Sequence, residues 1–159
     1  MRIWVDADAC PGAIKDVLCA AAERVGVELV LVANRPLYTR PSNWVRSTRV
    51  AAGFDVADAY IVEQLAAGDL VITADVPLAA AAVEKGAHAL GPRGLEYTPE
   101  NIGEYLDTRN FMSDLRGAGQ VTGGPPPLTQ REVSAFANAL DRFLARARGA
   151  LRSTPGTRD

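Results

Sequence analysis

Short continuous runs of apolar residues alternate along the chain with segments in which apolar residues recur at helical spacing. The continuous runs are typical of strands buried on both faces of a sheet, and they occupy residues 3–5, 27–33, 70–74 and 87–90. The segments at helical spacing predict helices at residues 11–26, 56–67 and 77–85. A weaker pattern at residues 46–52 predicts an edge strand. This alternation favours an α/β fold, with a mostly parallel central sheet and helices on both faces.

The chain after the last of these strands differs in kind. Short helices are predicted at residues 98–106 and 111–116, followed by a connector rich in Gly and Pro at residues 117–127. A longer amphipathic helix is predicted at residues 129–148, where Thr129 and Glu132 form a capping-box pattern. We interpret residues 1–149 as one domain and residues 150–159 as a disordered tail.

Composition narrows the class of protein. The 159 residues are 48% hydrophobic and 23% charged, which suits one soluble domain. No apolar run is long enough to span a membrane, and no export signal is recognisable. His88 is the only histidine, which argues against a histidine base or a zinc site. Cys10 and Cys19 are too far apart on one helix for a disulfide, so we expect a cytoplasmic protein. Cys10, at that helix's start, is a weak candidate nucleophile.

Aspartates gather where the predicted strands end. Asp6 and Asp8 follow the first strand, Asp75 follows the strand at residues 70–74, and Asp55 and Asp58 open the helix between them. In a parallel sheet, ligands bind at the carboxyl ends of the strands. Carboxylates brought together there repel one another, and hard oxygen ligands suit Mg²⁺ or Mn²⁺. The alternative is that these aspartates only cap helices, which is the commoner role for a single acid at a helix start.

Three of these acids stand in a recognisable order. Asp6 follows the first strand, Asp58 opens the helix with the pattern D-x-x-I, and Asp75 ends the pattern T-x-D. This order resembles that of PIN-domain nucleases. The resemblance implies a PIN-like three-layer sandwich, with Asp6, Asp58 and Asp75 as catalytic metal ligands. A further acid that these nucleases carry on a helix has no matching position here, and Asp8 and Asp55 are the candidates to assist.

The sequence as a whole is more closely similar to the YaiI/YqxD family of bacterial proteins. The matching blocks extend over about residues 1–147, and they are VDADACP (5–11), VANR (32–35), GFDVADAYIVE (53–63), GDLVITADVPLA (68–79), the segment 97–102 and GGPPPL (123–128).

Basic and aromatic residues suggest a partner. The net charge of −2 carries no nucleic-acid signature, but an acid-free segment contains Arg35, Arg40, Arg46 and Arg49 with Tyr38 and Trp44. Arginines can track phosphates while rings stack on bases, although a solvated loop explains the pattern equally well. Candidate substrate-binding residues are Asn34, Arg35, Arg46, Arg49 and Thr73. Arg35 could instead pair with the aspartates, and a threonine in a strand is ordinary.

The leading hypothesis is a nuclease that uses Mg²⁺ or Mn²⁺ to hydrolyse phosphodiesters, with RNA favoured over DNA by analogy. A nucleic-acid-binding module without catalysis is the first alternative, and it predicts salt-dependent binding to intact RNA. The second alternative is a phosphatase or nucleotide-binding enzyme, against which stands the absence of a Gly-rich phosphate loop after any strand. No membrane partner is expected, and the oligomeric state is not predicted.

Overall fold

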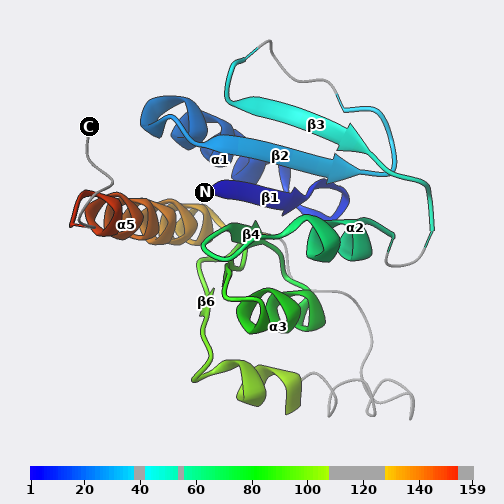
Figure 1. Ribbon diagram of the computed structural model, residues 1–159. Coiled ribbons are helices and arrows are strands. Elements are labelled where there is room, and N and C mark those ends of the chain that lie inside the picture. Colours follow the sequence, from blue (N-terminus) through cyan, green and yellow to red (C-terminus); the bar gives the residue numbers. More distant parts are fainter. Residues whose placement is uncertain (38–41, 54–55, 108–127, 154–159) are drawn as a thin grey trace.

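A computed structural model describes residues 1–37, 42–53, 56–107 and 128–153. These residues form a six-stranded sheet in the order β3-β2-β1-β4-β5-β6 (Figure 1). Neighbouring strands are parallel except for β5 and β6. The strands are β1 (Arg2–Asp6), β2 (Glu28–Ala33), β3 (Val45–Arg49), β4 (Leu70–Ile72), β5 (His88–Leu90) and β6 (Glu96–Tyr97). The predicted α/β fold with a mostly parallel sheet is confirmed.

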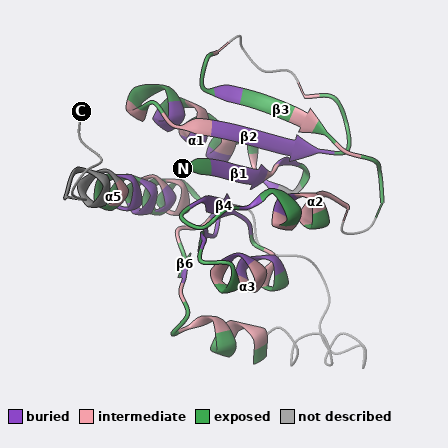
Figure 2. Cartoon of the chain, in the orientation of Figure 1, coloured by how far each residue is buried: buried purple, intermediate pink, exposed green. Residues whose placement is uncertain are grey.

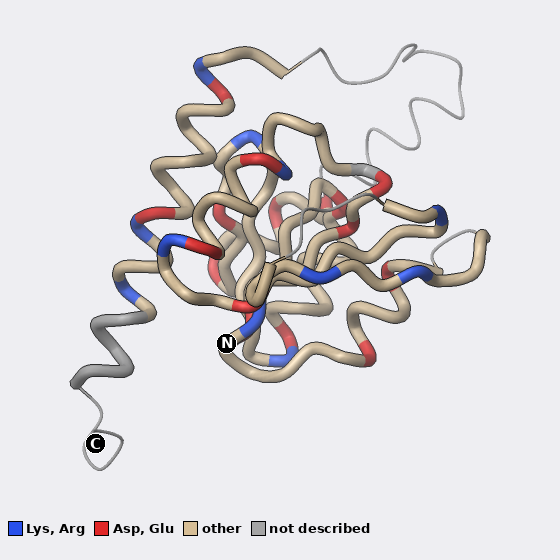
Figure 3. Tube along the Cα trace, turned by 90° about the horizontal axis from the view of Figure 1, so that it is seen from above, with Lys and Arg blue, Asp and Glu red and all other residues tan. Residues whose placement is uncertain are grey.

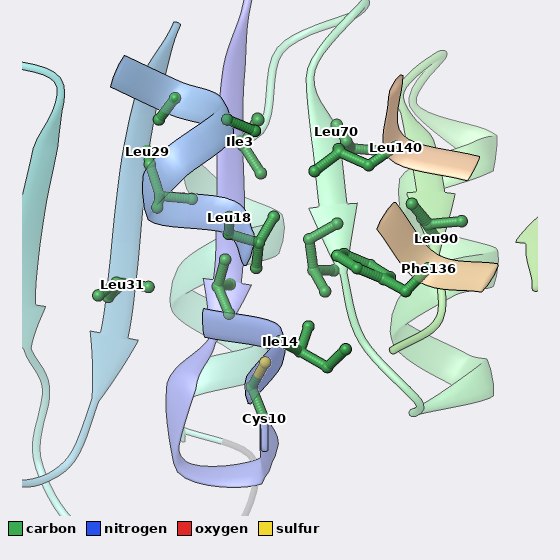
Figure 4. Close-up of a cluster of buried hydrophobic side chains, with 14 of the residues drawn as sticks. Ile3, Cys10, Ile14, Leu18, Leu29, Leu31, Leu70, Leu90, Phe136 and Leu140 are labelled. Carbon is green, nitrogen blue, oxygen red and sulfur yellow. The ribbon is translucent and has the colours of Figure 1, made fainter. Parts of the chain in front are cut away.

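Helices cover both faces of this sheet. One face packs against α1 (Gly12–Val25) and α5 (Gln130–Ser153), and the other against α2 (Val56–Gln64) and α3 (Val76–Glu84). Figure 2 shows the central strands buried between these layers. Figure 4 shows how Leu18 of α1 and Phe136 of α5 fill the first layer above the strands. Burying such side chains on both faces stabilises the sheet and fixes where each strand ends.

The structure shifts several predicted boundaries. The edge strand β3 begins at Val45 and ends at Arg49, and α2 ends at Gln64. The helix predicted at 98–106 is observed at 102–107. The two-residue strand β6 was not predicted, because so short a segment has no measurable periodicity. The helix predicted at 111–116 and the connector at 117–127 lie outside the described residues.

The C-terminal helix α5 begins as the sequence predicts. The Glu132 backbone N–H donates to Thr129 Oγ1 (3.1 Å), and the Thr129 N–H donates to Glu132 Oε1 (3.0 Å), which confirms the capping box. The helix continues to Ser153, into the segment interpreted as a tail from residue 150, and residues 154–159 lie outside the described part. No helix in the described ranges is long and apolar enough to cross a membrane.

The turn between β5 and β6 contacts α5 and helps to position this helix on the sheet. Arg93 forms an ion pair with Glu132, and this guanidinium is the main reason why the pKa of Glu132 lies below its usual value. Gly94 has a φ of +97° and approaches the α5 backbone at Ala135 so closely that a Cβ would lie 3.0 Å from the Ala135 carbonyl carbon. The turn therefore depends on a glycine at this position.

The opposite, amino-terminal edge of the sheet contains a buried carboxylate. Asp69, only 6% exposed, accepts hydrogen bonds from the Arg2 N–H (3.0 Å), the Trp4 indole N–H (3.1 Å) and the Ala66 N–H (3.0 Å). A buried charge is tolerated when it is hydrogen-bonded in this way. Asp69 thus joins the start of β1 to the turn that precedes β4.

Candidate functional site

Four aspartates from three separate segments line one pocket at the carboxyl ends of the strands. The pocket encloses about 290 Å³, and its described lining is Asp6, Asp8, Asn34, Ala51, Gly53, Ala57, Asp58 and Asp75. Because β1, β2 and β4 are parallel, the segments that leave them meet at this edge (Figure 1). Asp55, the fifth acid of the predicted cluster, lies outside the described residues.

Asp75 is positioned by the start of α3. It is the N-cap residue, and its Oδ1 accepts a hydrogen bond from the Leu78 N–H (3.0 Å). Its own N–H donates to Thr73 Oγ1 (2.9 Å), and Thr73 is 4% exposed. The capping role considered for Asp75 is therefore present. A carboxylate has a second oxygen, so capping and lining the pocket are compatible. Thr73 positions Asp75 and is not among the residues lining the pocket.

Asp6 and Asp58 approach the pocket from a strand and a helix. Asp6 is the last residue of β1, and Asp58 lies in the first turn of α2. Acids in that first turn are favoured by the helix dipole, so Asp58 has a stabilising role as well as its place in the pocket. Both aspartates make further polar contacts, and the spacing in the sequence correctly placed them beside Asp75.

Asp8 is held by the end of β2. It lies in the 3-10 turn η1 (Ala7–Ala9) that follows β1. Its Oδ2 accepts a hydrogen bond from the Asn34 N–H (2.8 Å), and its Oδ1 lies 3.5 Å from Arg35 Nε. The structure thus brings together Asn34, Arg35 and the aspartate cluster, as the sequence predicts for residues that follow parallel strands. The Asn34 contact uses its backbone.

The chemistry of these side chains fits a hard divalent cation, since four carboxylates face one small pocket. Their present placement does not complete a binding site. Within the described residues, no three Asp, Glu, His or Cys side chains are arranged to hold one metal ion. Asp8 is paired with Arg35 and Asp75 caps α3. Metal binding at this pocket would therefore require aspartate side chains to change rotamer.

The other candidate substrate-binding arginines, Arg46 and Arg49, are not among the described residues that line the pocket. Arg46 is near the start of β3, and its Nε lies 3.5 Å from Glu28 Oε1, which also pairs with Arg2. Arg49 ends β3 at the same edge as the aspartates, but it does not line the pocket. Figure 3 shows the Lys and Arg positions of the described residues on several parts of the chain, including α5 and the strands. Residues 38–41 of the predicted basic segment lie outside the described residues.

Small residues of the pocket were not predicted. Ala51, Gly53 and Ala57 complete its lining, and the signal available in the sequence was the run of small residues around the start of α2. A larger pocket of about 620 Å³ lies between α1 and the strands β2 and β3. We place the site in the smaller pocket because its acids come from three different segments. Among the described lining residues of the larger pocket, the charged side chains, including Lys15 and Glu23, all belong to α1.

The structure argues against Cys10 as a nucleophile. Burial raises the pKa of this thiol to about 12, and Figure 4 shows its sulfur turned toward Ile14 in the core. A thiol with so high a pKa stays protonated near neutral pH, and the thiolate is the reactive form. The favourable position before α1 is therefore outweighed by desolvation.

Cys10 should resist thiol reagents until the protein unfolds. With a disulfide reagent near pH ~8, we expect the partly buried Cys19 to react first and Cys10 only after urea is added. A Cys19→Ser variant should then show almost no reactive thiol in the native state. Rapid native labelling of that variant would contradict the buried, protonated state of Cys10.

Comparison with known proteins assigns the chain to a family. The family model described as "Uncharacterized BCR, YaiI/YqxD family" matches residues 4–146. The chain belongs to the YaiI/YqxD family. The match includes each described pocket-lining segment, from the end of β1 to the residue that caps α3, so these residues all lie inside the family domain. The resemblance to this family drawn from the sequence is thereby confirmed.

Close relatives extend over nearly the whole chain. A "UPF0178 protein" of Halorhodospira halophila is 64% identical over 92% of this chain and 97% of its own length. Proteins of the same description are 60% identical in Dechloromonas aromatica and 56% identical in Yersinia pestis, with coverage of at least 92% of this chain and 97% of theirs. A comparison with solved structures finds no significant match.

Proposed function

We propose that this YaiI/YqxD protein is a hydrolase that cleaves phosphodiesters with Mg²⁺ or Mn²⁺, and that RNA is its substrate in the cytoplasm. The observation that carries the proposal is the convergence of Asp6, Asp8, Asp58 and Asp75 on one pocket. Three separate segments present these carboxylates to one pocket, and like charges at close range repel one another. A cation explains why they are gathered.

Each aspartate has a distinct part in this proposal. Asp6, Asp58 and Asp75 are the ligands that would hold the ion, with Asp8 assisting. A bound divalent ion would supply a water of lowered pKa and would stabilise charge on the phosphate. The protein's own contribution is orientation, because the Leu78 N–H fixes one oxygen of Asp75 and the Asn34 N–H fixes one oxygen of Asp8. The order of the three ligands also underlies the proposed kinship with PIN-like folds.

Mn²⁺ titration by calorimetry tests the site directly. We expect saturable binding to the wild type, and at least about tenfold weaker binding after Asp6→Asn or Asp75→Asn, because each change removes a charged oxygen ligand. Asparagine also caps helices well, so Asp75→Asn should keep α3 intact. Asp141→Asn is the matched control, since this aspartate is exposed on α5 and pairs with Arg24. Unchanged Mn²⁺ affinity in both pocket variants would overturn the site.

Labelled single-stranded RNA then separates hydrolysis from binding. Incubation with Mn²⁺ should shorten the RNA with the wild type, and Asp75→Asn should leave it intact. Retention of full-length RNA by a wild type that binds Mn²⁺ would favour the non-catalytic binding module. Release of inorganic phosphate from mononucleotides without RNA cleavage would favour a phosphatase. Each of these results would replace the nuclease proposal.

A further inference from the structure

The pocket's acidic charge is balanced at one point by Arg35. Among the described lining residues there are four aspartates and no Lys or Arg. The guanidinium of Arg35 approaches from the end of β2, with its Nε 3.5 Å from Asp8 Oδ1. The side chain of Arg35 is 65% exposed, whereas that of Asp8 is 27% exposed. A cationic group on the solvent side therefore faces a more enclosed carboxylate.

The two oxygens of Asp8 have unlike partners. Oδ2 accepts from the Asn34 backbone N–H at 2.8 Å, a partner fixed by the main chain at the end of β2. Oδ1 faces a long side chain with many rotamers. An exposed ion pair of this kind contributes little to stability and exchanges readily with other ions. Asp8 could thus give up Arg35 and keep its orientation through Asn34.

Arg35 retains most of its hydrogen-bonding capacity in this pair. A guanidinium has five N–H donors in a planar fork, and the pair with Asp8 involves Nε at 3.5 Å. The fork geometry matches two oxygens of a phosphate. The same side chain is therefore suited to neutralise an aspartate at one time and to bind a phosphate at another, but it cannot do both fully.

We propose that Arg35 is an exchangeable counter-ion that couples cation binding to substrate binding. Without a divalent cation it neutralises Asp8. With a divalent cation bound, Asp8 Oδ1 would face the ion in place of Arg35, and Arg35 would be released to bind non-bridging oxygens of the substrate phosphate. This inference rests on the proposed function and adds an order of binding to it. The cation binds first and makes Arg35 available for the phosphate. By linkage, phosphate should then also strengthen cation binding.

Arg46 provides a closely matched control for Arg35. Its Nε also lies 3.5 Å from a carboxylate oxygen, and its side chain is also 65% exposed, but its partner is Glu28 away from the pocket. The variants Arg35→Gln and Arg46→Gln remove the same charge from the same degree of exposure. Any difference between them reports on position and not on net charge.

The first measurement is Mn²⁺ affinity by calorimetry at fixed ionic strength. Arg35→Gln should bind Mn²⁺ about three- to tenfold more tightly than the wild type, because the ion no longer competes with a guanidinium for Asp8. Arg46→Gln should match the wild type. Arg35→Lys keeps the competing charge, so its Mn²⁺ affinity should stay close to that of the wild type.

The second measurement is the affinity for uridine 5′-monophosphate, a probe with a phosphate but no phosphodiester. In the wild type, saturating Mn²⁺ should raise this affinity several-fold. At saturating Mn²⁺, Arg35→Gln should bind the probe about tenfold more weakly, and Arg35→Lys should also bind more weakly because it lacks the fork. Arg46→Gln should again behave as the wild type.

The outcomes separate this inference from the proposed function. Mn²⁺ binding that is weakened by Asp75→Asn but equal in the wild type and Arg35→Gln would overturn the exchange and leave the metal site standing. Weaker Mn²⁺ binding by Arg35→Gln would overturn the exchange as well. No Mn²⁺ binding by either protein would overturn both proposals. Equal effects of Arg35→Gln and Arg46→Gln would show a general charge effect and overturn the specific role of Arg35.

Discussion

Asp69→Ala should lower the free energy of unfolding by about 3–5 kcal/mol, because three N–H groups would lose their acceptor at once. These donors are the backbone N–H groups of Arg2 and Ala66 and the indole N–H of Trp4. Trp4 is itself only 3% exposed, so water cannot easily replace the lost carboxylate at its indole. Urea unfolding followed by tryptophan fluorescence measures the loss.

Two comparisons identify the cause of that loss. Asp141→Ala also removes a carboxylate, one that pairs with the Arg24 guanidinium, but both of these side chains are more than half exposed. We therefore expect the free energy of unfolding to change by less than about 1 kcal/mol. Asp69→Asn keeps one acceptor oxygen but turns an NH₂ group toward a donor. Its loss of unfolding free energy should therefore lie between those of Asp69→Ala and Asp141→Ala. A loss in Asp69→Ala no larger than in Asp141→Ala would show that this network does not hold the edge of the sheet.

The position of Asp69 also separates stability from function. It lies before β4, at the amino end of the strands, whereas the aspartate pocket lies at their carboxyl ends. An Asp69→Asn variant that remains folded should therefore keep the Mn²⁺ affinity of the wild type. A buried aspartate thus stabilises the amino end of the strands, and the aspartates of the proposed site lie at the carboxyl end.

Strand direction alone was enough to predict which aspartates lie near one another at the site. Continuous apolar runs located the parallel strands, and parallel strands leave a sheet at a shared edge, so Asp6, Asp58 and Asp75 were rightly placed near one another. The same reasoning would have placed Arg46 elsewhere, because it stands at the beginning of its strand. Arg46 was grouped with Arg49 because the two are close in sequence. In an extended strand, however, residues three positions apart lie toward opposite ends of the strand.

Side-chain partners were harder to predict than positions. The two interpretations of Arg35, a phosphate ligand or a partner of the aspartates, were indistinguishable in sequence, and the structure shows the second with Asp8. Asp69 was not singled out, because nothing in the pattern G-D-L distinguishes a surface turn from a carboxylate with three donors. Rotamers and hydrogen bonds depend on distant segments, which apolar periodicity does not encode.

Gly94→Ala should destabilise the protein by about 2–4 kcal/mol, through a strained backbone and a steric clash together. Gly94 has a φ of +97°, and a Cβ there would lie 3.0 Å from the Ala135 carbonyl carbon and 3.2 Å from its oxygen. Backbone atoms inside α5 cannot move aside without displacing the helix, which packs through Phe136 into the core. Thermal and urea unfolding of the variant measure the combined cost.

Two other glycines separate the strain from the clash. Gly68 has a φ of +88°, and an added Cβ would meet no atom within 4 Å, so Gly68→Ala should show the conformational cost alone, about 1–2 kcal/mol. Gly103 lies in the helical segment 102–107, has open space and has no positive φ, so Gly103→Ala should be neutral or slightly stabilising. If Gly94→Ala costs no more than Gly68→Ala, the close approach to Ala135 does not constrain α5. A clear excess in Gly94→Ala would establish that the β5–β6 turn fixes how this helix sits on the sheet.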